Sequence, residues 1–262
     1  MQNTQVLLNY RDSIAFITLN RPQARNAINL ELARDLLNVA MECDGNPTVR
    51  AVVLSGAGST FSVGGDLKSF AAQGEHLSAY IKELITFFHT AVSCLARMDA
   101  PVIAAVQGNL AGAGMSLACA CDLVLAAESA RFTAAYTRIG LTPDGSLTYF
   151  LSRCVGMKRA LELTLLNRTL SAQEAYQWGI VNSVVPEDAL QEQAETLARQ
   201  LTAGPTSAFG MTKRLLQQGW NESLETQMMY ETQAISTIAG SADSQEGISA
   251  FLEKRSPRFS ER

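Results

Sequence analysis

The stretch Pro101–Ala127, PVIAAVQGNLAGAGMSLACACDLVLAA, decides the fold class. Its first six residues, Pro101–Val106, are an apolar run that predicts a buried strand. A run of small residues, Ala111–Ala120, predicts a helix, and Asp122–Ala126 predicts a second strand. A strand, a helix and a strand in this order are typical of a layered α/β core.

The residues before this stretch continue the alternation of strands and helices. Alternating apolar residues predict a hairpin of Gln5–Asn9 and Ser13–Asn20 around a turn at Tyr10–Asp12. Helical spacing predicts a helix at Asn29–Cys43, capped by Asn29, and another at His76–Met98. Between these two helices, the apolar run Ala51–Leu54 predicts a strand.

From Gly145 onward the sequence is mostly helical. The predicted helices are Leu147–Leu166, Ser171–Trp178, Leu190–Ala203, Thr206–Gln217, Ser223–Ile238 and Ser244–Lys254, and Gly179–Val185 is predicted to return as a strand. A composition shift near residue 200 divides the chain into a core, residues 1–200, and a helical C-terminal region, residues 201–262.

Composition excludes several classes of protein. With 262 residues, 47% of them hydrophobic, the chain is too apolar to be disordered, and its net charge of −4 argues against nucleic-acid binding. We find no secretory signal and no uninterrupted apolar run long enough to cross a membrane. Five cysteines without a pairing pattern indicate free thiols in a reducing, cytoplasmic compartment, and two histidines alone do not make a metal site.

Two glycine-rich segments each follow a predicted strand, at Ser55–Asp66 and Gly108–Gly114. The first lacks the G-x-G-x-x-G spacing of a dinucleotide loop. The second precedes a helix, where backbone N–H groups are free to face an anion or a polarised carbonyl, although close packing of the helix on the sheet would also favour glycine.

Five segments in order resemble the crotonase (enoyl-CoA hydratase/isomerase) family: NRPQARNAIN (20–29), AVVLSGAGSTFSVGGDLKSF (51–70), PVIAAVQGNLAGAGMSLACACDLVLAA (101–127), ARFTAAYTRIGLTPDG (130–145) and FLEKRSPRF (251–259). The resemblance covers nearly the whole chain. It implies an α/β fold, a spiral of ββα units with a helical C-terminal trimerisation region, assembled as a homotrimer or a dimer of trimers. It also implies an acyl-CoA thioester as substrate, with no metal or redox cofactor.

The resemblance assigns roles to individual residues. The backbone N–H groups of Gly65 and Ala113 match the two donors that hold the thioester oxygen, where such donors stabilise developing negative charge. Ser116 and Tyr136 stand where hydratases carry two glutamates, so hydration by two carboxylates is not expected. Asp144 matches the single catalytic aspartate of two subgroups. One is a CoA isomerase group that includes the ring-epoxide isomerase of phenylacetate degradation, and the other is the 4-chlorobenzoyl-CoA dehalogenase.

The histidine in Phe87–His89 matches a histidine that activates water in the dehalogenase. Its helical spacing would place His89 on the apolar face of its helix, so it is either a core residue, a pocket residue or a catalytic base. Arg25 and Lys68 match positions near the nucleotide end of CoA, and Lys254 matches one that reaches a neighbouring subunit's ligand. The expected substrate contacts also include Ala27, Val63, Asp66, Leu67, Phe70, Phe88, Gly112, Tyr136 and Ile139.

These residues predict an acyl-CoA isomerase in which Asp144 carries a proton between carbons of the acyl group while the Gly65 and Ala113 N–H groups hold an enolate. A hydrolytic aryl-CoA dehalogenase that uses Asp144 and His89 is the first alternative. An enoyl-CoA hydratase and a non-catalytic scaffold or RNA-binding protein are the others.

Overall fold

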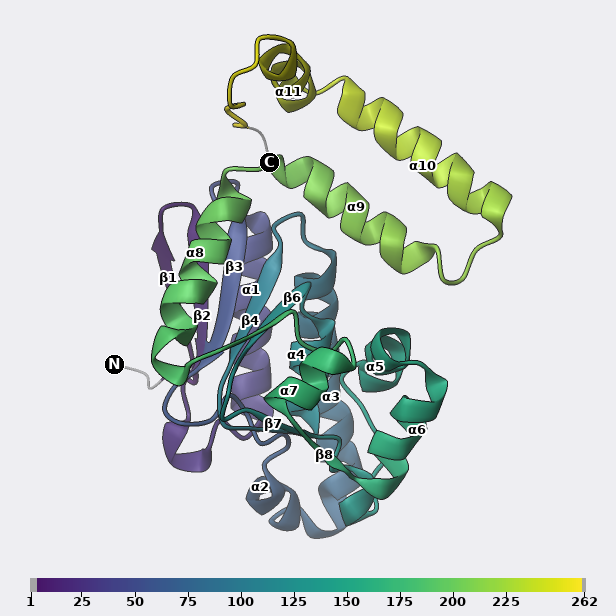
Figure 1. Cartoon of the computed structure of the whole chain (residues 1–262). Coiled ribbons are helices and arrows are strands. Elements are labelled where there is room, and N and C mark those ends of the chain that lie inside the picture. The colour runs from purple at the N-terminus through teal and green to yellow at the C-terminus, as the bar shows by residue number, and fades with distance from the viewer. Residues whose placement is uncertain (1–3, 261–262) are drawn as a thin grey trace.

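A computed structural model describes residues 4–260, with a six-stranded sheet at its centre in the order β1-β2-β3-β4-β6-β9 (Figure 1). Its strands are β1 (Val6–Arg11), β2 (Ile14–Leu19), β3 (Ala51–Gly56), β4 (Val102–Val106), β6 (Leu123–Ala127) and β9 (Ser183–Val185). The β1–β2 pair is antiparallel and every other pair is parallel. A second sheet contains β5 (Asn109–Ala111), β7 (Arg131–Thr133) and β8 (Thr169–Ser171).

Helices cover both faces of the larger sheet and form the C-terminal region. They are α1 (Leu30–Gly45), α2 (Leu67–Ala71), α3 (Leu77–Arg97), α4 (Ala113–Ala120), α5 (Leu147–Val155), α6 (Met157–Leu166), α7 (Ala172–Gln177), α8 (Leu190–Thr202), α9 (Thr206–Gln218), α10 (Leu224–Ala239) and α11 (Ala242–Leu252). Short 3-10 turns lie at Pro22–Ala24, Gly74–His76, Thr137–Ile139 and Glu187–Ala189.

The apolar strands β3 and β4 place side chains on both faces of the sheet, as expected for buried parallel strands. One face carries Val53 and Ile103, which pack with Leu190, Ala194 and Ala198 of α8. Their spacing of four residues makes one apolar stripe on that helix. The opposite face belongs to a larger core that includes α1, α3 and α4. The sheet therefore lies between two helical layers, the mixed α/β arrangement that the sequence predicts.

Two consecutive ββα units position the glycine-rich turn. In β4-β5-α4 and β6-β7-α5, the first strand joins the large sheet and the second joins the small sheet. The β5 and β7 strands pair in parallel, from Asn109 opposite Arg131 to Ala111 opposite Thr133. Because α4 begins only two residues after β5, its N-terminus lies at the edge of the small sheet.

Several predicted boundaries were wrong, for identifiable reasons. The predicted helix Leu147–Leu166 is two helices, because Gly156 adopts a positive φ of 78° between α5 and α6. The hairpin turn falls at Asp12 and Ser13, both with positive φ, so β1 extends through Tyr10 and Arg11. The predicted helix at Ala111–Ala120 begins at Ala113, since the residues before it form β5. Of the predicted strand Gly179–Val185, only Ser183–Val185 forms a strand, β9.

The C-terminal helices α9, α10 and α11 extend beyond the layered core (Figure 1). Two ion pairs join α9 to the core: Lys213 Nζ lies 2.6 Å from Asp122, and Arg214 lies 2.6 Å from Asp99. These helices leave several large apolar side chains exposed, among them Leu216, Leu224, Ile235, Phe251 and Leu252, and Trp220 is exposed between α9 and α10. No helix within residues 4–260 has the length and apolar character that crossing a membrane requires.

Candidate active site

A cavity of about 830 Å³ is enclosed by segments from five parts of the fold: the loop before α1, the residues around α2, the inner face of α3, the start of α4 and the turn before α5. Every residue that the sequence predicts for the site lines this cavity except His89 and Lys254. Those lining residues are Arg25, Ala27, Val63, Gly65, Asp66, Leu67, Lys68, Phe70, Phe88, Gly112, Ala113, Tyr136, Ile139 and Asp144.

Gly65 and Ala113 both present their backbone to the cavity. Ala113 is the first residue of α4, so its N–H has no partner inside the helix. Gly65 pairs with Ile28 in an isolated parallel bridge whose hydrogen bonds involve the neighbouring N–H of Asp66 and carbonyl of Gly64. Both residues thus border the same cavity, and neither N–H donates to another described residue.

Close backbone contact holds these two segments together. A Cβ on Gly64 would lie 2.5 Å from the carbonyl oxygen of Ala111 and 3.1 Å from the nitrogen of Ala113, and the residue has a φ of +87°. Only glycine allows this approach with this backbone conformation. Gly64 therefore brings the Gly65 donor beside the Ala113 donor.

Asp144 is one of two acidic residues among the described residues that line the cavity. The hydroxyl of Tyr136 donates to its Oδ1 over 2.5 Å, and the hydroxyls of Tyr136 and Ser116 lie 2.9 Å apart. No hydrogen bond from a described residue reaches Oδ2 of Asp144. Although turn chemistry at Pro143–Gly145 is compatible with a helix cap, the N-cap of α5 is Ser146, and the Asp144 side chain makes no capping bond. Its carboxylate instead faces the cavity.

The surroundings of Asp144 favour its neutral form. Burial raises the pKa of this carboxyl above its ordinary value of 3.8, and the hydrogen bond from Tyr136 and the charge of His89 offset only part of the rise. Burial and the neighbouring Asp144 also raise the pKa of Tyr136, so the phenol stays a hydrogen-bond donor. A carboxylate destabilised by burial is a stronger base than one in water.

His89 does not occupy the place that its helical spacing predicts. The side chain is exposed rather than packed on the apolar face of α3, and it does not line the cavity. Its Nε2 accepts the backbone N–H of Gly145 over 3.0 Å. The ring thus holds the residue that follows Asp144, and the nitrogen lone pair is already engaged.

Asp66, the other acidic residue of the cavity wall, is ion-paired. Arg21 lies 3.0 Å from its Oδ2, and its Oδ1 accepts the N–H groups of Lys68 and Ser69 at the start of α2. Burial acts to raise the pKa of Asp66, but the hydrogen bonds from Arg21 and Ser69 outweigh it and hold the pKa below its ordinary value. We expected Asp66 to bind substrate, whereas its contacts are those of a helix cap and an ion pair.

The cavity combines cations with a largely apolar wall. Arg25 and Lys68 line it with exposed side chains, whereas Lys254 is exposed beyond α11 and does not contribute to the cavity of its own chain. The apolar lining residues are mainly those of α2 and α3 and of the turn after Tyr136: Leu67, Phe70, Ile81, Leu84, Ile85, Phe88, Ile139 and Leu141. Such a cavity suits an apolar group attached to a charged one.

Sequence reasoning missed two residues that build this site. Asn26 is fully buried and donates to the carbonyls of Ala57 and Thr60, which fixes the loop that carries Arg25 and Ala27. Asn26 lies within the segment NRPQARNAIN (20–29), which carries part of the family resemblance, and this position could have indicated a role in the site. Ser116, which the family resemblance marks only as a departure from a hydratase glutamate, is also fully buried, and its hydroxyl lies 2.9 Å from that of Tyr136.

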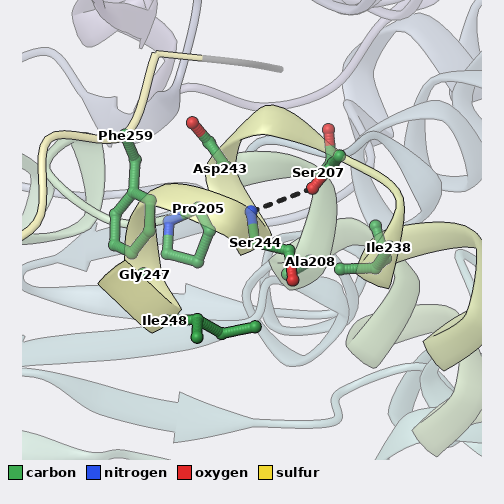
Figure 2. A pocket seen from close by; sticks show the side chains of 10 residues that line it. Pro205, Ser207, Ala208, Ile238, Asp243, Ser244, Gly247, Ile248 and Phe259 are labelled. Atoms are coloured by element: carbon green, nitrogen blue, oxygen red, sulfur yellow. Dashed lines mark hydrogen bonds between the residues drawn. The ribbon is translucent and has the colours of Figure 1, made fainter. Parts of the chain in front are cut away.

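A second, smaller cavity of about 270 Å³ lies among the C-terminal helices, far along the chain from Asp144 (Figure 2). Its wall brings Pro205 and Ala208, at the start of α9, together with Ile248 of α11 and Phe259. Asp243, beside it, accepts the N–H of Ser260 over 2.7 Å. The part of the chain that the structure describes has no cluster of three metal-ligating side chains.

Comparison with known proteins gives a consistent result over nearly the full length. The family model for enoyl-CoA hydratase/isomerase matches residues 9–262. The 1,2-epoxyphenylacetyl-CoA isomerase of Escherichia coli (strain K12) is 36% identical over 97% of both chains. The 4-chlorobenzoyl coenzyme A dehalogenase-2 of Arthrobacter sp. is 34% identical over 95% of this chain and 91% of its own. A crystal structure of an enoyl-CoA hydratase from Polaromonas sp. JS666 superimposes with a TM-score of 0.93 at 32% identity, covering 97% of this chain and 99% of the other.

Proposed function

The chain belongs to the enoyl-CoA hydratase/isomerase family, and from that membership we propose that it is an acyl-CoA isomerase that moves a double bond by a proton shuttle. The observation that carries the proposal is the state of Asp144. It is the carboxylate of the cavity wall that has no ion pair among the described residues, and its Oδ2 is left open to the cavity.

The proposed reaction follows from this geometry. The thioester oxygen of a 3-enoyl-CoA accepts the N–H groups of Gly65 and Ala113, and Asp144 Oδ2 removes a proton from C2. The electron pair of the C2–H bond forms a dienolate, whose charge is held by the two donors. The protonated Asp144 then returns the proton to C4, which leaves a double bond between C2 and C3. Because one proton leaves and one returns, no metal, redox cofactor or water is consumed.

In the proposed reaction, the two N–H donors and the base Asp144 each lower the activation free energy. In comparable sites, losing one oxyanion-hole donor costs about 3–4 kcal/mol of transition-state stabilisation. A positioned general base contributes about 10²–10⁴-fold in rate. Both effects require the acyl group to lie between Asp144 and the two N–H groups, and the apolar wall around Phe88 and Leu141 supports that placement.

Two alternative reactions fit the site less well. Hydration by two carboxylates needs acids where Ser116 and Tyr136 stand. Hydrolytic dehalogenation needs a base for water, and the Nε2 of His89 accepts the Gly145 N–H instead. A non-catalytic role, as a scaffold or an RNA-binding protein, would not explain an open carboxylate opposite two free donors.

The proposed CoA-binding residues and oligomeric state rest on family membership, on charge and on exposed apolar side chains. Arg25 and Lys68 supply point charges on flexible side chains, which suit the phosphates of CoA. The exposed apolar side chains of α9, α10 and α11 favour a homotrimer or a dimer of trimers, in which Lys254 could meet a neighbour's ligand.

Product masses after incubation with three substrates test this proposal. We expect purified protein to convert a 3-enoyl-CoA to an isomer of unchanged mass, which liquid chromatography separates from the substrate, and to leave a 2-enoyl-CoA without added water. Chloride should stay on 4-chlorobenzoyl-CoA. A gain of water or the replacement of chloride by hydroxyl would refute the isomerase assignment in favour of the corresponding alternative.

A further inference from the structure

We infer that Ser116 is a positioning residue, whose hydroxyl ties the turn that carries Asp144 to the helix that carries the Ala113 donor. The inference rests on the proposed proton shuttle, because it concerns the distance between the base and the oxyanion donors. Ser116 does not line the cavity, so it acts through Asp144 and Tyr136 rather than on the substrate.

Three oxygen atoms surround the Ser116 hydroxyl. It donates to the carbonyl of Asp144 at 2.9 Å, lies 3.2 Å from the carbonyl of Gly112 and 2.9 Å from the hydroxyl of Tyr136. The serine is fully buried in α4, one turn after Ala113. One side chain therefore joins the oxyanion helix, the acidic turn and the tyrosine that holds the carboxylate.

Counting protons shows how the three groups share hydrogen bonds. Ser116 and Tyr136 have one hydroxyl proton each, and the carboxylate of Asp144 is the strongest acceptor in the group. The Tyr136 proton is therefore directed to Oδ1. The Ser116 proton is left for a carbonyl, and that of Asp144, at 2.9 Å, is nearer than that of Gly112, at 3.2 Å. Tyrosine thus holds the side chain of Asp144, and serine holds its backbone.

The turn needs this support because its backbone is strained at Ser146. This residue has a φ of 71°, a region that non-glycine residues rarely adopt, whereas Gly145 adopts its φ of 59° without strain. Such conformations persist only where the surrounding structure fixes them. Here His89 holds the N–H of Gly145 from α3, and Ser116 holds the carbonyl of Asp144 from α4.

Packing restricts what could replace Ser116. A Cβ added to Gly145 would lie 2.9 Å from the Cβ of Ser116 and 2.6 Å from the ring of Phe88. The turn therefore packs directly against residue 116, and a long side chain there would displace either the turn or Phe88. A small residue with a hydroxyl meets both the space and the hydrogen-bonding need.

The test compares Ser116→Ala with Ser116→Cys, which keeps the volume but loses the strong hydrogen bond. Ser152→Ala is the matched control, because it removes a helical serine hydroxyl that donates to the carbonyl of Thr148 within α5, away from the cavity. For both Ser116 variants we expect kcat for 3-enoyl-CoA isomerisation to fall about ten-fold, as for one lost hydrogen bond, with KM unchanged. The control should keep both parameters.

Hydrogen exchange without substrate provides a second, independent measurement. In both Ser116 variants, the amides of the peptide that spans Asp144–Ser146 should exchange faster than in the wild type and in Ser152→Ala. A wild-type kcat in Ser116→Cys, a rise in KM with constant kcat, or unchanged exchange would overturn the inference. If the wild type does not isomerise 3-enoyl-CoA, the proposed function fails, and the exchange measurement alone decides whether Ser116 holds the turn.

Discussion

The backbone N–H of Gly145 donates to Nε2 of His89 across 3.0 Å, so the imidazole holds the peptide next to Asp144. A nitrogen that accepts this bond cannot at the same time take a proton from water. In the proposed isomerase, His89 therefore supports the Asp144 turn and is not a base for water. This contact is an observation that favours the proposed isomerase over a hydrolytic dehalogenase.

The His89 contact predicts how two substitutions differ. His89→Ala removes the acceptor, and we expect isomerisation to slow about two- to ten-fold, the effect of one hydrogen bond. His89→Gln offers a carbonyl oxygen to the same N–H and should retain most of the rate. Steady-state kinetics with 3-enoyl-CoA would measure both. Equal loss of several hundred-fold in the two variants would instead point to a catalytic imidazole.

The raised pKa of Asp144 predicts the pH dependence of activity. The carboxylate must be ionised to accept a proton, so kcat/KM should rise with pH through a limb that lies above 3.8. Since the Tyr136 hydrogen bond lowers the pKa of Asp144, Tyr136→Phe should move this limb to higher pH. A limb that stays in place or moves down in this variant would contradict the assigned hydrogen bond.

Burial of Asp144 also predicts a stability effect. Its pKa is raised in the folded state, so the folded chain binds this proton more strongly than the unfolded chain does. The associated stability is present below the unfolded pKa and is lost as the pH rises through the folded pKa. At pH 7 the ionised group is therefore a net cost.

Asp144→Asn should accordingly raise the unfolding midpoint at pH 7, and its advantage over the wild type should shrink as the pH falls toward 3. Thermal unfolding at several pH values measures this difference. Asp188→Asn, at an exposed position, is the control and should show no such trend. A less stable Asp144→Asn at pH 7 would show that the carboxylate is better accommodated than burial indicates.

The pair of Lys213 and Asp122 predicts how α9 is held to the core. Both side chains are mostly buried, and Lys213 also donates to the carbonyls of Met98 and Ala100. Burial raises the pKa of Asp122 despite the charge of Lys213. Lys213→Met leaves this carboxylate without its cation and should cost about 3–5 kcal/mol in urea unfolding. Adding Asp122→Asn should recover part of that loss, and no recovery would mean that the packing of Lys213 matters more than its charge.

Much of the fold could be predicted because its strands and long helices have regular patterns. The apolar runs of β3 and β4 and the amphipathic face of α3 specify buried elements by composition alone. Short elements such as β5, β7 and β8 have three residues each, too few for a period to be visible. Gly156 was not identified as a break in the helix because an isolated glycine is tolerated in many helices.

The site was partly predictable for a related reason. The family resemblance assigned the two backbone donors and Asp144, and all three line one cavity, whereas side-chain orientation depends on tertiary contacts. His89 was placed on an apolar face by periodicity, but the structure turns it toward Gly145. The role of Ser116 depends on the Asp144 turn, 28 residues away, which helical periodicity cannot reveal.

The most direct test of the central claim compares binding and turnover in Asp144→Asn. The variant keeps the shape of the side chain and an acceptor for the Tyr136 hydroxyl, but it has no base. We expect the Kd for a 3-enoyl-CoA, measured by calorimetry, to match that of the wild type, and isomerisation to fall about 10²–10⁴-fold. Full isomerase activity in Asp144→Asn, with binding intact, would contradict the proposed proton shuttle.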